Sequence, residues 1–186
     1  MRSFAATLWH LLGLAQPAAE PPRRRAGPPS SEAPTSRSQK RYDALVDQMK
    51  TAHGIRVHRW RSSTSGCAWE LKDRRGAVTR MIESPYPRGP VSTAVFLHEV
   101  GHHAIGFNRD RPRCLEEWAA WEWSLAAMET HGITITQRVV RRRDAALRYA
   151  VSKAIRRGIK RIPAELLPWT PVGVVSTPSD HAGAVG

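Results

Sequence analysis

The chain has only two cysteines, Cys67 and Cys114, among its 186 residues. This excludes a disulfide-rich secreted scaffold and favours a reducing cytoplasm, although one bridge between the two cysteines stays open. No apolar run approaches the roughly 20 residues that a membrane-spanning helix needs. A short apolar patch at residues 4–14 resembles a signal peptide, but it contains Trp9 and His10 and lacks a clean small-x-small cleavage site. We therefore expect a cytoplasmic protein without a membrane span.

Lysine is scarce as well, since the chain has five lysines and 24 arginines. Its formal net charge is +13. Such a charge attracts polyanions, which makes nucleic acid a candidate partner. With abundant alanine, glycine and proline, the arginine excess also fits a GC-rich coding sequence, so charge alone is weak evidence. The 41% of apolar residues fit one soluble globular domain with a real core.

Residues 98–102 form an HExxH motif, in which the first and last residues are His98 and His102. Residues four apart on an α-helix differ by about 40° in direction and lie about 6 Å apart along the axis, so both imidazoles can bind one metal ion. Glu99 points about 100° from His98, close enough to a metal-bound water to take its proton. The apolar residues before the motif predict a buried helix. Gly101 leaves room for another backbone or a substrate near the metal.

Catalytic zinc needs a third protein ligand and one position open to water. The following predicted helix offers Glu117, which shares a face with Ala120 and Trp123 at helical spacing and is therefore our choice. Glu116 is the close alternative, because neighbouring residues on a helix diverge by about 100° and only one of them can point at the metal. His131, beyond the end of that helix, is a further alternative.

Composition divides the chain into three parts. Residues 1–37 are basic and hold six of the 14 prolines, and we expect a disordered tail there. Residues 38–168 carry the periodic patterns of a folded domain. Residues 169–186 have no period and are expected to form a flexible tail.

Apolar spacing of three and four residues predicts helices in this domain, and short β-rich segments between turns predict strands. The predicted helices span residues 38–53, 92–106, 112–129 and 136–157, and the predicted strands span residues 55–60, 67–71 and 78–83. Ser92 or Thr93 is the expected cap of the motif helix, and the turn at residues 74–76 predicts a hairpin. Arg141 to Arg143, together with Arg156 and Arg157, mark the expected solvent-exposed face of the last helix. This order predicts an α+β, zincin-like fold, in which a small antiparallel sheet packs with the HExxH helix and two or three further helices.

A family resemblance rests on two segments. Residues 96–103 read Phe-Leu-His-Glu-Val-Gly-His-His, and residues 117–124 follow the pattern Glu-x-x-Ala-x-x-Trp-Ser. Together they resemble the ImmA/IrrE family of gluzincin-like zinc metallopeptidases, which pairs an HExxH helix with a glutamate in a later helix, commonly within E-x-x-A-x-x-F-A. The resemblance covers residues 40–130 in element order and implies a protein substrate such as a transcription regulator. It also implies that Glu99 activates water and that zinc is bound by His98, His102 and Glu117.

Two functions fit these features. The first is a zinc-dependent metalloendopeptidase with Glu99 as general base, acting on a protein or peptide substrate. The second is a non-catalytic zinc-containing protein that binds nucleic acid, or regulates, through the arginine-rich helix. Structural zinc needs four protein ligands and no general base, and no fourth ligand is evident near the motif, so we expect the peptidase. The candidate donors to its oxyanion are His103, His131, Tyr86 and Tyr149.

Overall fold

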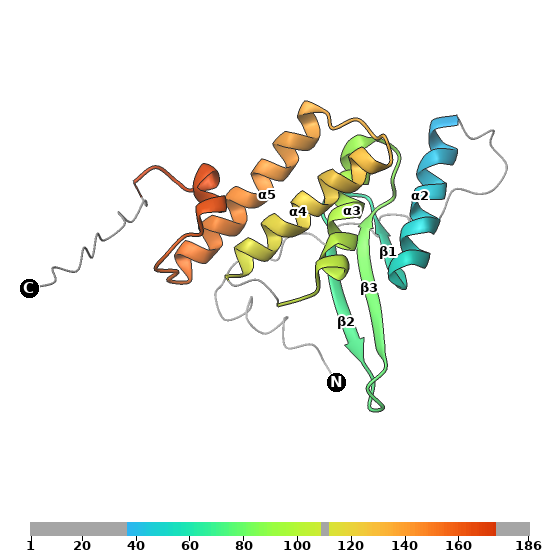
Figure 1. Cartoon of the computed structure of the whole chain (residues 1–186), viewed down its shortest axis with the longest axis horizontal. Coiled ribbons are helices and arrows are strands. Elements are labelled where there is room, and N and C mark those ends of the chain that lie inside the picture. Colours follow the sequence, from blue (N-terminus) through green and yellow to red (C-terminus); the bar gives the residue numbers. More distant parts are fainter. Residues whose placement is uncertain (1–36, 109–111, 174–186) are drawn as a thin grey trace, which may run out of the picture.

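The computed structural model describes residues 37–108 and 112–173 (Figure 1). Its elements are, in chain order, α2 (Arg37–His53), β1 (Ile55–Arg61), β2 (Cys67–Lys72), β3 (Val78–Pro85), α3 (Pro90–Ile105), α4 (Arg113–Thr130), α5 (Gln137–Arg156) and the 3₁₀ helix η1 (Ala164–Trp169). The predicted α+β class is confirmed. The apolar patch at residues 4–14 and most of both predicted tails lie outside the described residues. No helix in the described ranges is long and apolar enough to cross a membrane.

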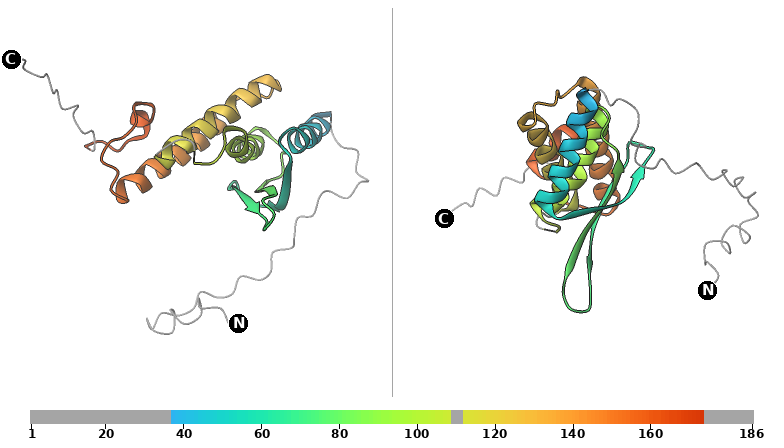
Figure 2. Two further views of the ribbon diagram at one scale, coloured as in Figure 1. Left: turned by 60° about the horizontal axis from the view of Figure 1, so that its bottom comes forward. Right: turned by 90° about the vertical axis from the view of Figure 1, so that its right-hand side faces the viewer.

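The sheet has three strands in the order β1-β3-β2. β2 and β3 form the predicted antiparallel hairpin, which projects beyond the helices (Figure 2). β1 pairs with β3 in parallel, with Val57 opposite Ile82, so the sheet is mixed and the prediction of an antiparallel sheet is wrong for β1. The physical reason lies in the strand order, because β3, whose residues 82–85 are the most buried stretch of the sheet, takes the central place between β1 and β2. The chain reverses direction between β1 and β2 and again between β2 and β3, so β1 and β3 run the same way.

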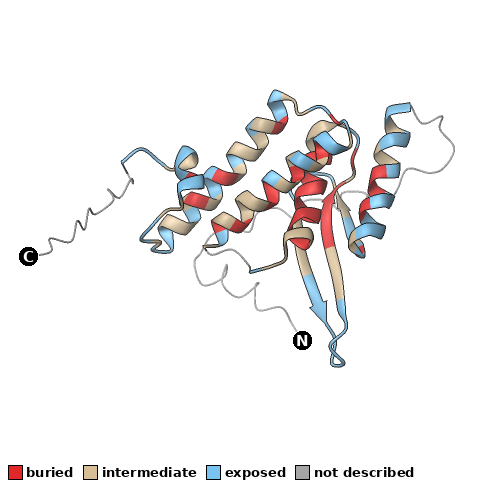
Figure 3. Cartoon of the chain, viewed as in Figure 1, coloured by how far each residue is buried: buried red, intermediate tan, exposed pale blue. Residues whose placement is uncertain are grey.

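α3 is the central helix of the domain. Residues 93–103 are all buried, as expected for a helix enclosed on every side. It packs against β3 on one side and α4 on the other, and burial concentrates on these facing surfaces (Figure 3). A Cβ atom at Gly101 would lie 2.9 Å from the backbone oxygen of Ala120 and 3.3 Å from the ring of Trp123. The prediction that Gly101 makes room for another backbone is therefore confirmed.

The start of α3 differs slightly from the prediction. Gly89 is the N-cap and Pro90 the first helical residue, where a missing N–H costs nothing. Ser92 is the third helical residue, and its hydroxyl accepts a hydrogen bond from the backbone N–H of Gly89 at 3.2 Å. Ser92 thus stabilises the helix start from inside the first turn.

The C-terminal part of the described chain folds back onto α5. Thr136 caps α5, since its hydroxyl accepts a hydrogen bond from the N–H of Val139 at 3.4 Å. η1 was not predicted, because a six-residue segment that ends near Pro168 has no helical period to detect. Leu166 in η1 is fully buried, and Trp169 donates from Nε1 to Asp144 at 3.0 Å. Packed structure therefore continues one residue past the predicted end of the domain.

Candidate metal centre

The two motif histidines point at one carboxylate oxygen. Nε2 of His98 lies 3.4 Å from Oε2 of Glu117, and Nε2 of His102 lies 3.6 Å from the same atom. One potential ligand atom from each of the three residues lies within 4.8 Å of the others. The helical turn of α3 thus brings the imidazoles together, and the packing of α4 on α3 adds the carboxylate.

This arrangement fits a zinc ion. Tetrahedral zinc with bonds of about 2.0–2.2 Å to nitrogen and oxygen places its ligand atoms about 3.3–3.5 Å apart, close to the distances here. Nδ1 of both His98 and His102 is buried and has no hydrogen-bond partner. Two imidazoles and a carboxylate are also the donor set of well-known catalytic zinc sites. These residues therefore suit zinc in number, type and spacing.

The pKa values of His98 and Glu117 favour metal binding, whereas burial acts to lower the pKa of His102 and its contacts with Glu117 outweigh that effect and raise it. Burial lowers the pKa of His98 to about 4, so this ring is neutral at pH 7 and has a lone pair to offer. Burial opposes ionisation of Glu117 as well, but its contacts with His102 and His98 outweigh that effect and hold its pKa well below the usual range. Glu117 is therefore an anion at neutral pH, as a zinc ligand must be.

Glu116, the alternative ligand, contacts the other side of His102. Its Oε1 lies 3.4 Å from Nδ1 of His102, just outside hydrogen-bond geometry, and neither atom has another partner. Its Oε2 accepts a hydrogen bond from the backbone N–H of Asn108 at 2.9 Å, and the residue is 1% exposed. A carboxylate in this place fixes the orientation of a ligating imidazole. Glu116 therefore suits the role of an orienting group, while Glu117 suits that of the ligand.

His131, the other alternative, lies outside this cluster. It caps the C-terminal end of α4, 14 residues beyond Glu117, which corresponds to about 20 Å along the helix. Its backbone oxygen accepts a hydrogen bond from Arg41 of α2. The structure therefore does not bring His131 to the motif histidines.

Glu99 is buried beneath the loop that joins β1 to β2. Its exposed fraction is 4%, and the space above it is filled by Gly66, where a Cβ atom would lie 2.6 Å from Cγ of Glu99. Burial raises the pKa of Glu99 to about 8, and the nearby Glu117 adds to the rise. A carboxyl group with a pKa near neutrality can both accept and return a proton.

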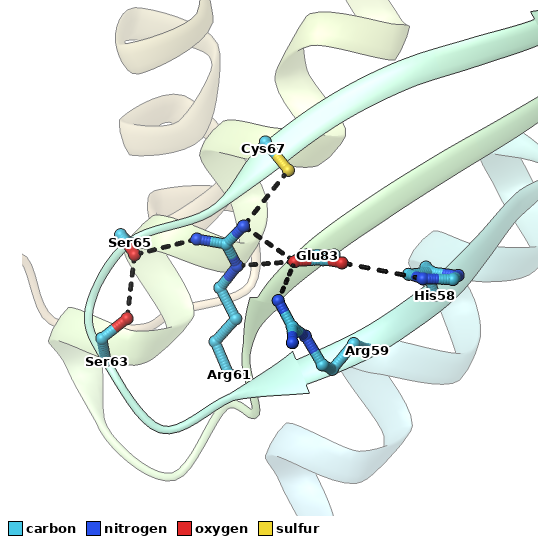
Figure 4. A network of polar contacts seen from close by, with 7 residues as sticks. All are labelled: His58, Arg59, Arg61, Ser63, Ser65, Cys67 and Glu83. Carbon is cyan, nitrogen blue, oxygen red and sulfur yellow. Dashed lines mark hydrogen bonds and ion pairs between the residues drawn. The ribbon is translucent and has the colours of Figure 1, made fainter. Parts of the chain in front are cut away.

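A polar network centred on Glu83 holds this loop (Figure 4). Glu83 on β3 accepts hydrogen bonds from Arg59 at 2.9 Å and from Arg61 at 2.8 Å. Arg61 also donates to Ser65 at 3.2 Å and to the sulfur of Cys67 at 3.6 Å, on either side of Gly66. Burial acts to raise the pKa of Glu83, but the two arginines outweigh it and lower the pKa. The ionised Glu83 thus fixes the position of Arg61, and Arg61 in turn holds the loop that covers Glu99.

Both cysteines are free thiols, so the bridge that the sequence left open is absent. Cys67 starts β2, and Cys114 lies buried in the first turn of α4. Burial raises the pKa of each thiol. Neither cysteine therefore favours the thiolate form that a metal ligand needs.

A cavity of about 750 Å³ opens beside the cluster. Its lining includes His98, Glu99, His102 and Glu117, and residues of α5 form a long part of its wall. Arg142 of α5 also lines it and donates to the backbone oxygen of Thr64 from Nη2 at 2.9 Å and from Nε at 3.1 Å. The sequence placed Arg142 on a solvated face, whereas the structure places it in the cavity wall. A run of three arginines carries no local signal that singles out this one.

The four candidate oxyanion donors differ in whether they reach the cavity. Tyr149 lines the cavity, whereas His103, Tyr86 and His131 do not. His103 is buried with Nε2 3.1 Å from the backbone oxygen of Met81, and the hydroxyl of Tyr86 donates to Asp43 at 2.6 Å. Both of these side chains therefore point into the packed structure between sheet and helices.

Comparison with protein-family models, with curated proteins and with solved structures finds no match to this chain. The likeness to the ImmA/IrrE family accordingly rests on the two sequence motifs.

Proposed function

We propose that the protein is a zinc-dependent metalloendopeptidase of the ImmA/IrrE type, with Glu99 as general base. The observation that carries the proposal is the convergence of His98, His102 and Glu117 beside a buried carboxyl group and an open cavity. A structural zinc needs four protein ligands, whereas a catalytic zinc keeps one position for water. The group found among the described residues has three members, which favours catalysis.

The chain's own residues then carry the proton transfers. When bound, zinc would lower the pKa of a coordinated water toward about 7 and polarise the carbonyl of a bound peptide. Glu99 accepts a proton from the attacking water as the new C–O bond forms. It then gives this proton to the amine nitrogen as the C–N bond breaks. The water is thus divided between the new carboxyl group and the new amine.

Negative charge that develops on the carbonyl oxygen needs a fixed donor. Arg142 is suited to this role, because its two hydrogen bonds to Thr64 hold the guanidinium at the cavity wall near Glu99. Its guanidinium carbon also lies 5.8 Å from the ring centroid of Trp121, a contact that fixes it further. Tyr149 is the second donor within the cavity wall.

An extended peptide fits the open edge of the sheet. Among the described strands β2 pairs only with β3, so its other edge is unpaired. Cys67 and Ala68 at the start of β2 line the cavity beside Glu99. A peptide can add to such an edge through main-chain hydrogen bonds, which would place its backbone across the metal centre. A regulatory protein as substrate and a cytoplasmic location remain predictions from the sequence.

Metal analysis and hydrolysis of casein test the proposal together. The purified protein should contain about one zinc per chain, and His98→Ala should lose it. Glu99→Gln should keep zinc and lose hydrolysis, while Glu129→Gln, an exposed position on α4, serves as the matched control and should behave as wild type. Hydrolysis that persists in zinc-loaded Glu99→Gln would contradict the proposed mechanism.

The second function retains one supporting observation. Several cations of α5 are exposed and lie outside the cavity wall: Arg138, Arg141, Arg148 and Arg156. Salt-sensitive binding to DNA by a protein that hydrolyses no peptide would favour that function instead.

A further inference from the structure

We propose that the cavity selects peptides with acidic side chains, which Lys153 of α5 and Arg157, the residue that follows this helix, bind at a distance from the bond that is cut. This inference rests on the proposed peptidase function and names its substrate class. The two cations line the same cavity as the metal ligands, and the rise of α5 separates them from the level of Glu117 by about 10 and 16 Å.

The helical spacing of α5 shapes this part of the cavity. Its residues Ala146, Ala150 and Ala154 follow one another at four-residue spacing, line the cavity and leave it open because their side chains are small. The neighbouring row at the same spacing is Tyr149, Lys153 and Arg157, which also lines the cavity. One face of the helix thus supplies a small apolar floor and a cationic rim.

Buried apolar residues beside the alanine row hold α5 in place. Val139, Leu147 and Val151 are buried against the rest of the core. The cavity face is therefore a fixed wall of the fold.

The charges of this wall are unbalanced. The only acidic residues that line the cavity in the described chain are Glu99 and Glu117, both at the metal end. Lys153 and Arg157 form no ion pair within residues 37–108 and 112–173. Nζ of Lys153 lies 5.9 Å from the ring centroid of Tyr149. Unpaired cations in a concave wall create a positive potential that attracts anionic groups.

The antiparallel packing of α4 and α5 gives the distance from the metal centre. Trp121 on α4 lies beside Arg142 on α5, so Glu117, one turn earlier on α4, lies roughly level with Ala146. Lys153, and Arg157 at the C-cap of α5, then lie about 10 and 16 Å further along the axis of this helix, at 1.5 Å per residue. An extended peptide advances about 3.3 Å per residue. We therefore expect the acidic side chains about three to five residues from the bond that is cut.

A peptide fits this cavity better than nucleic acid does. Its volume of about 750 Å³ is in the range of pockets that enclose small ligands, and it holds a few residues of extended peptide. The cations that would serve a nucleic-acid surface, such as Arg148 and Arg156, lie outside the cavity wall. Lys153 and Arg157 instead line the cavity that the metal ligands also line.

Binding and cleavage of matched decapeptides test the inference. One Glu is moved stepwise through a neutral fluorescent peptide, and each peptide is compared with its Gln and Lys counterparts. Affinity is measured by fluorescence anisotropy with zinc-loaded Glu99→Gln protein, and kcat/KM with the wild type. Each exposed ion pair contributes about two- to fivefold, so the best peptide with two Glu should bind about tenfold more tightly than its Gln counterpart.

Charge reversal provides the control. The double variant Lys153→Glu with Arg157→Glu should lose this preference and favour Lys peptides. The matched variant Arg148→Glu with Arg156→Glu makes the same change in net charge outside the cavity and should keep the preference for Glu. Circular dichroism and zinc content verify that each variant is folded.

The outcomes separate the two proposals. Equal affinity for Glu and Gln peptides, or equal loss of preference in both double variants, would overturn the acidic-substrate inference, even if peptides are cut in a Glu99-dependent way. A preference for Glu peptides without any hydrolysis would leave the binding inference standing and reject the peptidase. Binding of a DNA oligonucleotide that depends on Lys153 and Arg157, with no discrimination among peptides, would assign these cations to nucleic acid instead.

Discussion

Gly66 is the position at which the smallest substitution should test the proposed mechanism. A Cβ atom there would lie 2.6 Å from Cγ and 2.7 Å from Cδ of Glu99. The loop around it is held by Arg61, through Ser65 and Cys67, and by Arg142 on the backbone oxygen of Thr64. In Gly66→Ala the Glu99 side chain is therefore the part that must move.

The size of the effect follows from these distances. Carbon atoms in ordinary contact are about 3.5–4.0 Å apart, so the Glu99 side chain must shift by about 1 Å. A misplacement of this size costs about 100-fold in rate, or about 2.7 kcal/mol in the barrier. Overpacking should also lower the free energy of unfolding by about 1–3 kcal/mol. The three atoms nearest to the added Cβ all belong to Glu99 and none to a metal ligand, so zinc should stay bound.

Three measurements on the same preparation check this prediction: kcat for a fluorogenic peptide, zinc per chain, and Tm. The control is Gly89→Ala, where the backbone is extended and no atom lies within 4 Å of the added Cβ. We expect kcat to fall in Gly66→Ala alone, with full zinc content in both variants. Wild-type kcat in zinc-loaded Gly66→Ala would refute the view that catalysis requires Glu99 in this position.

Three further predictions concern the metal site and its surroundings. In Glu116→Gln the zinc affinity should fall roughly 10–100-fold at unchanged stoichiometry, because His102 loses its orienting carboxylate; an unchanged Kd in chelator competition would assign Glu116 a purely structural role. In Gly101→Ala the added methyl meets the backbone oxygen of Ala120, so Tm should fall by an amount equivalent to about 1–3 kcal/mol and zinc affinity should fall with it. The pKa of Glu99 is raised from 4.5 to about 8 in the folded chain, so its contribution to stability is complete below pH 4.5 and is lost as the pH rises through about 8. In urea unfolding without metal, the free energy of unfolding of Glu99→Gln should therefore rise relative to that of the wild type between pH 5 and 8, by at most roughly 5 kcal/mol. A difference between the two proteins that does not change with pH would contradict this.

The metal cluster could be predicted from the sequence because its geometry is local. Four-residue spacing alone turns His98 and His102 the same way, and the structure has both beside one carboxylate oxygen. Glu117 was favoured because Ala120 and Trp123 share its face of the helix. The structure places both against Gly101 of α3, which is why that face is turned toward the motif.

The sheet order and the place of Arg142 could not be predicted, because both depend on contacts between distant residues. Periodicity identifies a strand but not its partner, so the parallel pairing of β1 with β3 has no local signal. Arg142 looks like its neighbours Arg141 and Arg143 in sequence. In the structure Arg142 differs from these neighbours because it donates a hydrogen bond to the backbone oxygen of Thr64, which lies 78 residues earlier in the chain.

Adjacent glutamates on α4 could serve the centre in two ways, because neighbouring helical residues point about 100° apart. Glu117 faces Nε2 of both histidines, whereas Glu116 faces Nδ1 of His102 alone. His102 is therefore held between two carboxylates. His98 has no partner at Nδ1 and is held instead by stacking on Trp121, with ring centroids 4.4 Å apart.

Because the two histidines are held in different ways, the geometry of the metal centre depends on residues of α4. The helix supplies the third ligand, the group that orients His102 and the ring that stacks on His98. A change in the packing of α4 on α3 must therefore disturb both imidazoles at once, whereas loss of Glu116 disturbs one. The close approach at Gly101 is then a requirement of the metal site as well as of the core, since it sets the distance between the two helices that share the ligands.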